Sequence, residues 1–342
     1  MSASVKTVYL AAPGDITLKD VPYPQKADDQ VLIKVESVGI CGSDIGAYRG
    51  VNPLVTYPRV IGHEVVGTVI EGGVGMPAGI AVGDRVIVDP YINCGHCYPC
   101  SIGRTNCCEH LKVIGVHVEG GMSEVFAHPA RLLHRVPPGI PLEAIPLAEP
   151  LTIALHAMHR TGLKSGEHIV IIGAGAIGLL CALASLSYGA VPILVDILDE
   201  RLTHAQTHGV PHVINPRHED AVAAVKRITQ GRMAEVVVEA SGSNIAIQDT
   251  LRYVSFAGRI ALTGWPKNET PLPTNLITLK EVNVRGSRTS VREFAEALKM
   301  IADGVVPASA VISKAISMEE IPAAVVELAQ FPERHLKINA VL

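Results

Sequence analysis

Aromatic side chains are scarce in this chain of 342 residues: Phe, Tyr and Trp together form 4% of it, and Trp occurs once. Glycine, with 31 residues, and small aliphatic side chains are abundant instead. Such a composition suits sheets packed closely against helices and argues against an aromatic recognition surface. The length allows about two domains with a large buried core.

Charge is also sparse. Charged residues form 18% of the chain, the formal net charge is -4, and no basic run occurs. Nucleic acid and anionic membrane surfaces are therefore not expected as partners. Residues 1–10 include one lysine but no apolar stretch long enough for a signal peptide. We expect a cytoplasmic protein, because seven cysteines, an odd number, fit a reducing compartment.

One uncharged stretch, residues 169–195, is long enough to span a bilayer. It contains four glycines and one proline, which divide it into strand, turn, helix and strand. A parallel strand that is buried on both faces also reads as a continuous apolar run. We therefore interpret the stretch as part of a soluble α/β domain.

The periodicity of the chain changes near residue 150. Short strands and turns through residues 5–38 and 60–90 predict an antiparallel β barrel. Later strands alternate with helices that end near residues 188 and 208, and the expected strands are 169–172, 193–196, 213–215, 236–239 and 259–262. This alternation predicts a parallel, doubly wound sheet, so the fold class is α/β. An amphipathic helix is expected from about residue 291.

Four cysteines lie within fifteen residues: Cys94, Cys97, Cys100 and Cys108. Thiolates at this spacing can surround one Zn²⁺ tetrahedrally, with bonds of about 2.3 Å. Four sulfur ligands leave no position for substrate, so the pattern predicts a structural zinc site. A disulfide knot or scattered thiols are the alternative, and Cys107 could replace Cys108 as the fourth ligand.

A glycine pattern, Gly173-Ala-Gly175-Ala-Ile-Gly178, follows an apolar strand and opens a helix. In this context Gly173 permits a tight turn, Gly175 lets the backbone approach a pyrophosphate, and Gly178 packs the helix on the strand. Asp196 lies 18 residues past Gly178, where a carboxylate accepts from ribose hydroxyls and repels a 2′-phosphate. NAD is therefore expected rather than NADP, and a purely structural glycine turn is the alternative.

A third group consists of Cys41, Ser43, His63 and Glu64. Each of these residues alone is unremarkable. Beside a zinc lobe and a dinucleotide motif, a thiolate, an imidazole and a carboxylate predict a second, open zinc site that leaves one position to water or substrate. Such a zinc can bind an alcohol and lower its pKa.

The chain resembles the zinc-dependent medium-chain alcohol dehydrogenases, and within them the sorbitol and threonine dehydrogenase branch. The resemblance rests on Cys-Gly-Ser-Asp at 41–44, Gly-His-Glu at 62–64, Gly-Asp-Arg-Val at 83–86, the cysteine lobe, Ala-Glu-Pro-Leu at 148–151 and the glycine pattern. It covers the whole length. Segments 103–109, 113–117 and 286–288 are similar to bacterial members that act on sugar acids such as L-galactonate.

The resemblance implies a GroES-like catalytic domain formed by residues 1–155 and 291–342, with a Rossmann NAD-binding domain, residues 156–290, inserted. It also implies a homodimer or homotetramer and two zinc ions per chain. Cys41, His63 and Glu64 match the catalytic zinc ligands, and Glu149 matches a position that supplies a third ligand or holds the zinc-bound water. The sequence leaves open whether Glu64 or Glu149 binds directly.

Further roles follow from the same resemblance. Ser43 matches the hydroxyl that takes the alcohol proton. The residues that match the cofactor site are Gly173, Gly175, Ile177, Gly178, Asp196, Arg201, Gly264 and Arg288. Many members carry a proton-relay histidine five residues after the cysteine ligand, but this chain has Gly46 there, so the end of the relay stays open.

The expected reaction is transfer of a hydride from a secondary alcohol of a polyol or sugar acid to NAD. Arg288 is a candidate partner for a substrate carboxylate, and His117 is a candidate for the same substrate site. The alternatives are a sorbitol-like polyol or L-threonine dehydrogenase, an NADPH-dependent aldehyde reductase, and a non-catalytic nucleotide-binding relative.

Overall fold

The computed structural model describes residues 4–342, which form two compact units. The first comprises the described chain up to Glu149 together with Phe294–Ala302 and Ile312–Leu342, and the second comprises Pro150–Glu293 and Asp303–Val311. The predicted domain limits at 155/156 and 290/291 stay a proposal. No helix of the described chain is long and apolar enough to cross a membrane.

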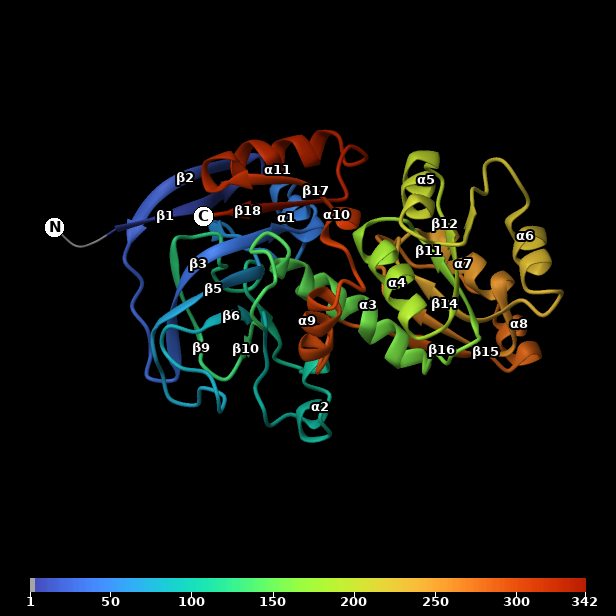
Figure 1. The fold of residues 1–342 in the computed structure, drawn as a ribbon, viewed down its shortest axis with the longest axis horizontal. Coiled ribbons are helices and arrows are strands. Elements are labelled where there is room, and N and C mark those ends of the chain that lie inside the picture. Colours follow the sequence, from blue (N-terminus) through green and yellow to red (C-terminus); the bar gives the residue numbers. More distant parts are fainter. Residues whose placement is uncertain (1–3) are drawn as a thin grey trace. The chain divides into compact units, whose positions relative to one another are not determined.

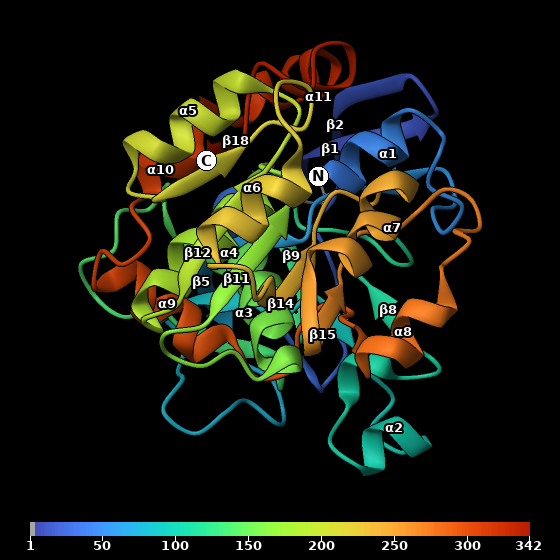
Figure 2. The same ribbon diagram turned by 90° about the vertical axis from the view of Figure 1, so that its right-hand side faces the viewer.

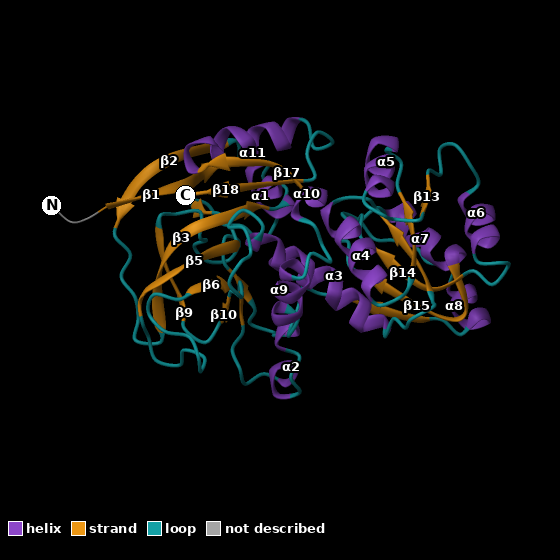
Figure 3. Cartoon of the chain, in the orientation of Figure 1, coloured by secondary structure: helices purple, strands orange, loops and turns teal. Residues whose placement is uncertain are grey.

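The first unit is built mainly from β-strands (Figure 3). Its strands are β1 (Ser4–Ala12), β2 (Asp15–Pro22), β3 (Gln30–Ile40), β4 (Arg59–Val60), β5 (Glu64–Glu71), β6 (Arg85–Val88), β7 (Tyr91–Ile92), β8 (Lys112–Val113), β9 (Val125–Pro129), β10 (Leu133–Arg135), β17 (Ile312–Ser317) and β18 (Lys337–Val341). Its helices are α1 (Gly42–Tyr48), α2 (Tyr98–Ser101), α9 (Phe294–Ala302) and α11 (Ile321–Gln330), with 3₁₀ turns at Thr105–Cys107, Ile145–Leu147 and Met318–Glu320. Helix α3 (Ala148–Thr161) begins at the end of its first segment.

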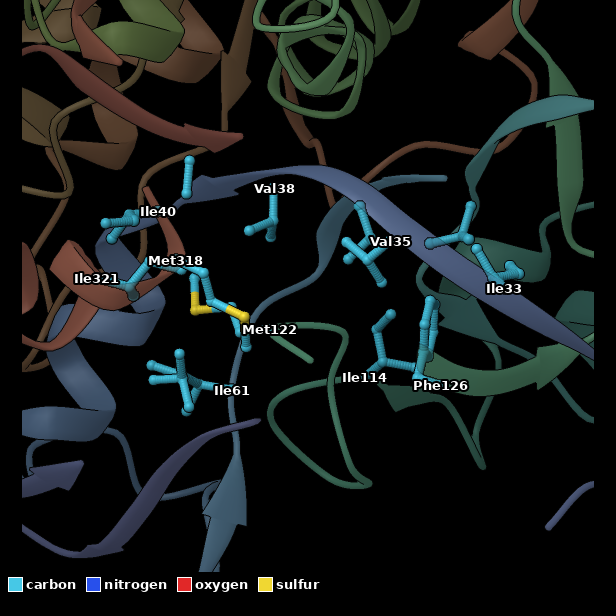
Figure 4. Packing of buried hydrophobic residues seen from close by; sticks show 14 of the residues in the cluster. Ile33, Val35, Val38, Ile40, Ile61, Ile114, Met122, Phe126, Met318 and Ile321 are labelled. Carbon is cyan, nitrogen blue, oxygen red and sulfur yellow. The ribbon is translucent and has the colours of Figure 1, made fainter. Parts of the chain in front are cut away.

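Strand β3 is central to the first unit. It lies between β5 and β18 in a sheet of order β10-β6-β5-β3-β18-β17, and it also pairs with β9. Its side chains Ile33, Val35 and Val38 are almost completely buried, whereas Lys34 is exposed. Figure 4 shows the three buried side chains in the core cluster that also contains Met122 and Phe126. The sheet is antiparallel except for the parallel pair β17–β18, which the sequence pattern did not predict.

The second unit is a six-stranded sheet in which every pairing is parallel, with the strand order β13-β12-β11-β14-β15-β16. The strands are β11 (His168–Ile172), β12 (Val191–Val195), β13 (His212–Ile214), β14 (Ala234–Glu239), β15 (Val254–Leu262) and β16 (Asn283–Gly286). The helices are α4 (Ala176–Ser187), α5 (Asp199–Thr207), α6 (Ala221–Ile228), α7 (Asn244–Tyr253), α8 (Thr274–Lys280) and α10 (Ala308–Val311).

Strand order reverses beside β11, and the helices therefore cover both faces of this sheet. Right-handed connections carry the chain from β11 through α4 to β12 in one direction and from β14 through α7 to β15 in the other. Figures 1 and 2 show α4 and α7 on opposite faces. Ligands of such sheets bind at the carboxyl ends of the strands beside the reversal point. The prediction of a doubly wound parallel sheet is confirmed.

Candidate metal centres and nucleotide site

The four cysteines of the lobe converge on one point. The sulfur atoms of Cys94, Cys97, Cys100 and Cys108 all lie within 4.8 Å of one another. The Cys97 and Cys108 sulfurs are 3.8 Å apart, and a tetrahedron with Zn–S bonds of about 2.3 Å has an edge of about 3.8 Å. The donor set therefore fits a closed zinc site.

Backbone N–H groups donate to sulfur atoms of this cluster, although burial raises the pKa of Cys100 to about 12. The N–H groups of Cys94 and His110 each donate to the Cys108 sulfur at 3.3 Å. A hydrogen bond from the His96 backbone lowers the pKa of Cys94 to about 6. Cys107 lies outside the cluster, where Arg104 contacts its sulfur at 3.7 Å. The geometry thus favours Cys108 over Cys107 as the fourth ligand.

Pairing of β3 with β5 explains why Cys41, His63 and Glu64 meet. Cys41 follows the last residue of β3, and Glu64 opens β5 directly opposite Gly39. The donor atoms of Cys41, His63 and Glu64 lie within 4.8 Å of one another. A thiolate, an imidazole and one carboxylate form a three-ligand set that leaves a fourth position open, as catalytic zinc requires.

Asp44 connects the two backbone segments that carry these residues. It is almost fully buried, and its carboxylate accepts hydrogen bonds from the N–H of Cys41 (2.9 Å) and from the N–H of Gly62 (3.1 Å). Its Oδ1 lies 3.8 Å from Nδ1 of His63. That separation is too long for a hydrogen bond, so the Asp44 carboxylate acts on His63 through its charge. Asp44 is thus a positioning residue for the cluster.

The charges around His63 favour its protonated form. Burial on its own would lower its pKa, but the thiolate of Cys41 and the charges of Asp44 and Glu149 outweigh burial and raise that pKa well above its usual value. Ligating histidine must be neutral. Metal binding at this cluster would therefore release a proton from His63.

Glu149 lies in the first turn of α3 and is 1% exposed. One of its oxygens accepts a hydrogen bond from the hydroxyl of Tyr91, and burial raises its pKa. Glu149 interacts electrostatically with His63 and Glu64, yet it is not a member of the tight Cys41–His63–Glu64 group. The geometry favours Glu64 as the third ligand, with Glu149 close by.

Two polar side chains of the first unit, Ser43 and His117, are predicted to act in proton transfer and in substrate binding, respectively. The Ser43 hydroxyl is buried and has no hydrogen-bond partner among the described residues. His117 is half-buried, and its Nδ1 accepts the N–H of Val113 at 3.0 Å. In its neutral form His117 therefore carries its proton on Nε2.

The glycine pattern forms the turn between β11 and α4. Gly173 has φ +103, which favours glycine, and a Cβ at Gly178 would lie 1.8 Å from the carbonyl oxygen of Gly173. A Cβ at Gly175 would meet nothing within 4 Å. The first and third glycines are thus required by the fold, while Gly175 borders open space next to the N-terminus of α4, as a phosphate site needs.

Asp196 follows the last residue of β12 and lies beside the glycine turn. Its carboxylate accepts hydrogen bonds from the N–H of Ala174 (2.6 Å) and of Leu198 (2.9 Å). It borders a cavity of about 260 Å³ that Gly173, Ser241 and Ile245 also line. An anionic side chain at this edge of the sheet favours a ribose over a 2′-phosphate.

Glu239 organises the neighbouring loops. It is fully buried at the end of β14 and accepts hydrogen bonds from the N–H and hydroxyl of Ser241 and from the N–H of Gly242. A Cβ at Gly264 would lie 2.2 Å from the Gly242 nitrogen, so the loop after β15 can approach only because residue 264 is glycine.

The remaining predicted residues of the second unit are less enclosed. Ile177 and Arg201 are half-buried on α4 and α5, and Arg288 is exposed in the segment after β16. Oε1 of Glu293, five residues after Arg288, binds Nδ1 of His156 (2.8 Å) and Nδ1 of His159 (3.2 Å).

Sequence reasoning missed three residues of the first unit: Asp44, Tyr91 and Lys337. Lys337 is 4% exposed and donates to Oε1 of Glu64 at 2.5 Å. A weak signal existed, because Lys337 is a charged residue that opens the apolar segment Lys-Ile-Asn-Ala-Val. The contact itself spans 273 residues and leaves no local trace in the sequence.

Two family models match this chain. That of the alcohol dehydrogenase GroES-like domain matches residues 27–138, and that of the zinc-binding dehydrogenase matches residues 176–303. The chain is 66% identical over 341 residues, covering 100% of both proteins, to an uncharacterized zinc-type alcohol dehydrogenase-like protein of Haemophilus influenzae. It is 35% identical over 303 residues, 88% of each chain, to an L-galactonate-5-dehydrogenase of Escherichia coli K12.

Solved structures agree with this assignment. A short chain alcohol dehydrogenase from E. coli CFT073 complexed with NADH is 29% identical, with a TM-score of 0.92 and full coverage of both chains. A zinc-binding dehydrogenase from Sinorhizobium meliloti 1021 bound to NADP has the same identity, TM-score and coverage. With the GroES-like unit, the parallel nucleotide-binding sheet and these relatives, the chain belongs to the zinc-type medium-chain alcohol dehydrogenase superfamily of oxidoreductases.

Proposed function

We propose that this protein oxidises a secondary alcohol of a polyhydroxylated sugar acid, with NAD as the acceptor and with one catalytic and one structural zinc per chain. The observation that carries the proposal is the convergence of Cys41, His63 and Glu64 to within 4.8 Å. This set fits an open zinc site, and the four cysteines fit a closed one. When bound, zinc supplies the Lewis acidity that lowers the pKa of the alcohol, and NAD accepts the hydride.

The chain's own residues then perform three tasks. Asp44 holds the backbone of Cys41 and of Gly62, the residue before His63, in place. Ser43, whose hydroxyl has no hydrogen-bond partner among the residues described, relays the proton that the substrate hydroxyl loses: it accepts that proton while it passes its own hydroxyl proton on to water. The glycine turn and Asp196 bind the cofactor and orient it.

The most direct test is a substrate screen. Purified protein is incubated with NAD and with sugar acids, polyols and β-hydroxy amino acids, and the absorbance of the reduced cofactor is followed. Oxidation of sugar acids supports the proposal. Preferential oxidation of sorbitol or L-threonine would contradict the proposed substrate class but would still support the proposed reaction, alcohol oxidation. We also propose that the protein is cytoplasmic and that it forms a homodimer or homotetramer. Light scattering of the purified protein tests the oligomeric state.

Asp196 is expected to determine the choice of cofactor. The double variant Asp196→Ser, Ile197→Arg removes a carboxylate that repels a 2′-phosphate and adds a cationic partner for it. The ratio of kcat/KM for NAD to that for NADP should fall by about 10- to 100-fold, as expected for a charged hydrogen bond.

Asp199→Ser is the matched control, because Asp199 is exposed three residues further on and already binds Asn215 and His218. The control should retain the wild-type ratio of kcat/KM values. A wild type that prefers NADP would contradict this assignment of Asp196.

Arg288 is expected to recognise a substrate carboxylate. The exposed guanidinium offers the planar fork that binds carboxylates at two oxygens. Arg288→Ala should lower kcat/KM for a sugar acid by roughly 10²-fold, about 3 kcal/mol, and leave that for an uncharged polyol almost unchanged.

Arg232→Ala, another exposed arginine, should change neither value. The carboxylate role of Arg288 would be excluded by equal losses on the acid and the polyol, or by a wild type that prefers sorbitol to every sugar acid.

A further inference from the structure

Lys337 is a buried cation beside the candidate catalytic metal site. Its ammonium group lies 2.5 Å from Oε1 of Glu64 and 3.2 Å from the carbonyl oxygen of Ile40. The side chains of Lys337 and Glu64 are 5% and 0% exposed. A buried ammonium is strongly unfavourable unless it is paired, so this lysine is held here by its anionic partner.

Three adjacent strands create the pair. In the antiparallel sheet Ile338 of β18 lies opposite Ile40 of β3, and Gly39 of β3 lies opposite Glu64 of β5. A Cβ at Gly39 would lie 1.8 Å from Oε2 of Glu64. The middle strand thus leaves room for the carboxylate to reach across to Lys337, and glycine is required at that position.

The two oxygens of Glu64 have different environments. Oε1 is bound by Lys337, whereas Oε2 is buried and has no hydrogen-bond partner in the described part of the chain. Lys337 also interacts electrostatically with Cys41 and Glu149. Together with His63, the Lys337 ammonium therefore faces several of the acidic groups that a metal would meet.

We propose that Lys337 is a positioning residue for the metal site. It holds one carboxylate oxygen of Glu64, so that only the second oxygen of Glu64 is offered to a metal. It also balances the negative charge of the ligands when no metal is bound. This inference rests on the proposed catalytic metal site. The ammonium and a divalent cation then compete for the same anionic cluster. Removing Lys337 should destabilise the metal-free protein and strengthen zinc binding.

A purely structural role makes a different prediction. If Lys337 only fixed β18 to its neighbours, its loss would lower the thermal midpoint equally with and without zinc, and the zinc affinity would stay the same or fall. Zinc affinity therefore separates the two roles without any measurement of activity.

The experiment compares Lys337→Met with the wild type. A chelator removes the more accessible zinc, elemental analysis checks that one zinc per chain remains, and zinc is added back in competition with a chromogenic chelator. We expect the dissociation constant of the variant to be roughly tenfold lower or more, because repulsion between two neighbouring cations is removed. The thermal midpoint of the zinc-depleted variant should fall by about 6 °C or more, and zinc should restore most of that loss.

Lys280→Met is the matched control. Lys280 donates to two backbone carbonyls, those of Leu251 and Val254, both at 2.8 Å, and neither acceptor is a carboxylate. This variant should keep the wild-type zinc affinity. If Lys337→Met does not fold, the double variant Glu64→Gln, Lys337→Met is measured as well. Recovery of folding in the double variant supports charge compensation between Lys337 and Glu64. Failure of both variants to fold overturns the proposal.

The experiment separates failure of this inference from failure of the proposed function. If the wild type binds zinc at the Cys41 cluster while Lys337→Met responds to zinc like Lys280→Met, the role of Lys337 is wrong and the proposed function stands. If the wild type binds no metal at this cluster, the proposed function is wrong and the inference falls with it.

Discussion

Replacement of Cys41 by alanine is expected to abolish alcohol oxidation almost completely. The variant lacks one of the three residues that we propose as ligands of the open zinc site, and with it the Lewis acid that would stabilise the developing alkoxide by several kcal/mol, so kcat should fall by about 10³-fold or more. Elemental analysis should show close to two zinc ions per chain in the wild type and close to one in the variant. Binding of NAD, measured by calorimetry, should be retained, because the glycine turn is formed by the second unit.

Cys181→Ala is the control for this experiment. Cys181 is fully buried on α4 of the second unit and lies outside both cysteine-containing groups. Its loss should leave the zinc content and kcat unchanged. The open-site assignment would fail if Cys41→Ala retained both zinc ions and its activity, or if carefully prepared wild type contained fewer than two zinc ions.

Replacement of Cys100 by alanine should remove the other zinc and lower stability. Structural zinc contributes about 10 kcal/mol to folding in small zinc peptides. The loss should be smaller here, because the first unit also has its own hydrophobic core around β3. Thermal unfolding and elemental analysis of the same preparation measure both effects.

Cys107→Ala provides a close comparison, since Cys107 is adjacent to Cys108 in sequence yet outside the four-sulfur group. It should keep two zinc ions and an almost unchanged thermal midpoint. The assignment of the fourth ligand would be wrong if Cys107→Ala lost zinc and Cys108→Ala did not.

The parts of the fold that could be predicted from the sequence are those with local signals. The strand at residues 169–172 is an apolar run that ends at a glycine, and it agrees with β11 to within one residue. The helix that the sequence predicts to end near residue 188 corresponds to α4, Ala176–Ser187. The cysteine spacing likewise identified a group whose sulfur atoms converge in space.

The parts that could not be predicted depend on contacts between distant segments. Asp44 was visible within a motif, but a carboxylate three residues after a helix N-cap is also an ordinary capping residue. Its bond to Gly62 becomes apparent only when β3 and β5 are paired. The contact of Tyr91 with Glu149 and that of Lys337 with Glu64 join segments that no periodicity connects.

The position of β18 inside its sheet has a consequence for biosynthesis. This strand lies between β3 and β17, and 297 residues separate Lys337 from its backbone partner Ile40. The second unit, in contrast, comes mostly from the continuous segment Pro150–Glu293. Domains generally fold as units during synthesis, in the order in which their residues leave the ribosome. The nucleotide-binding unit can therefore gather most of its chain while the first unit still lacks an inner strand. The residues of the first unit that we propose as metal ligands reach their final surroundings only after translation of β18.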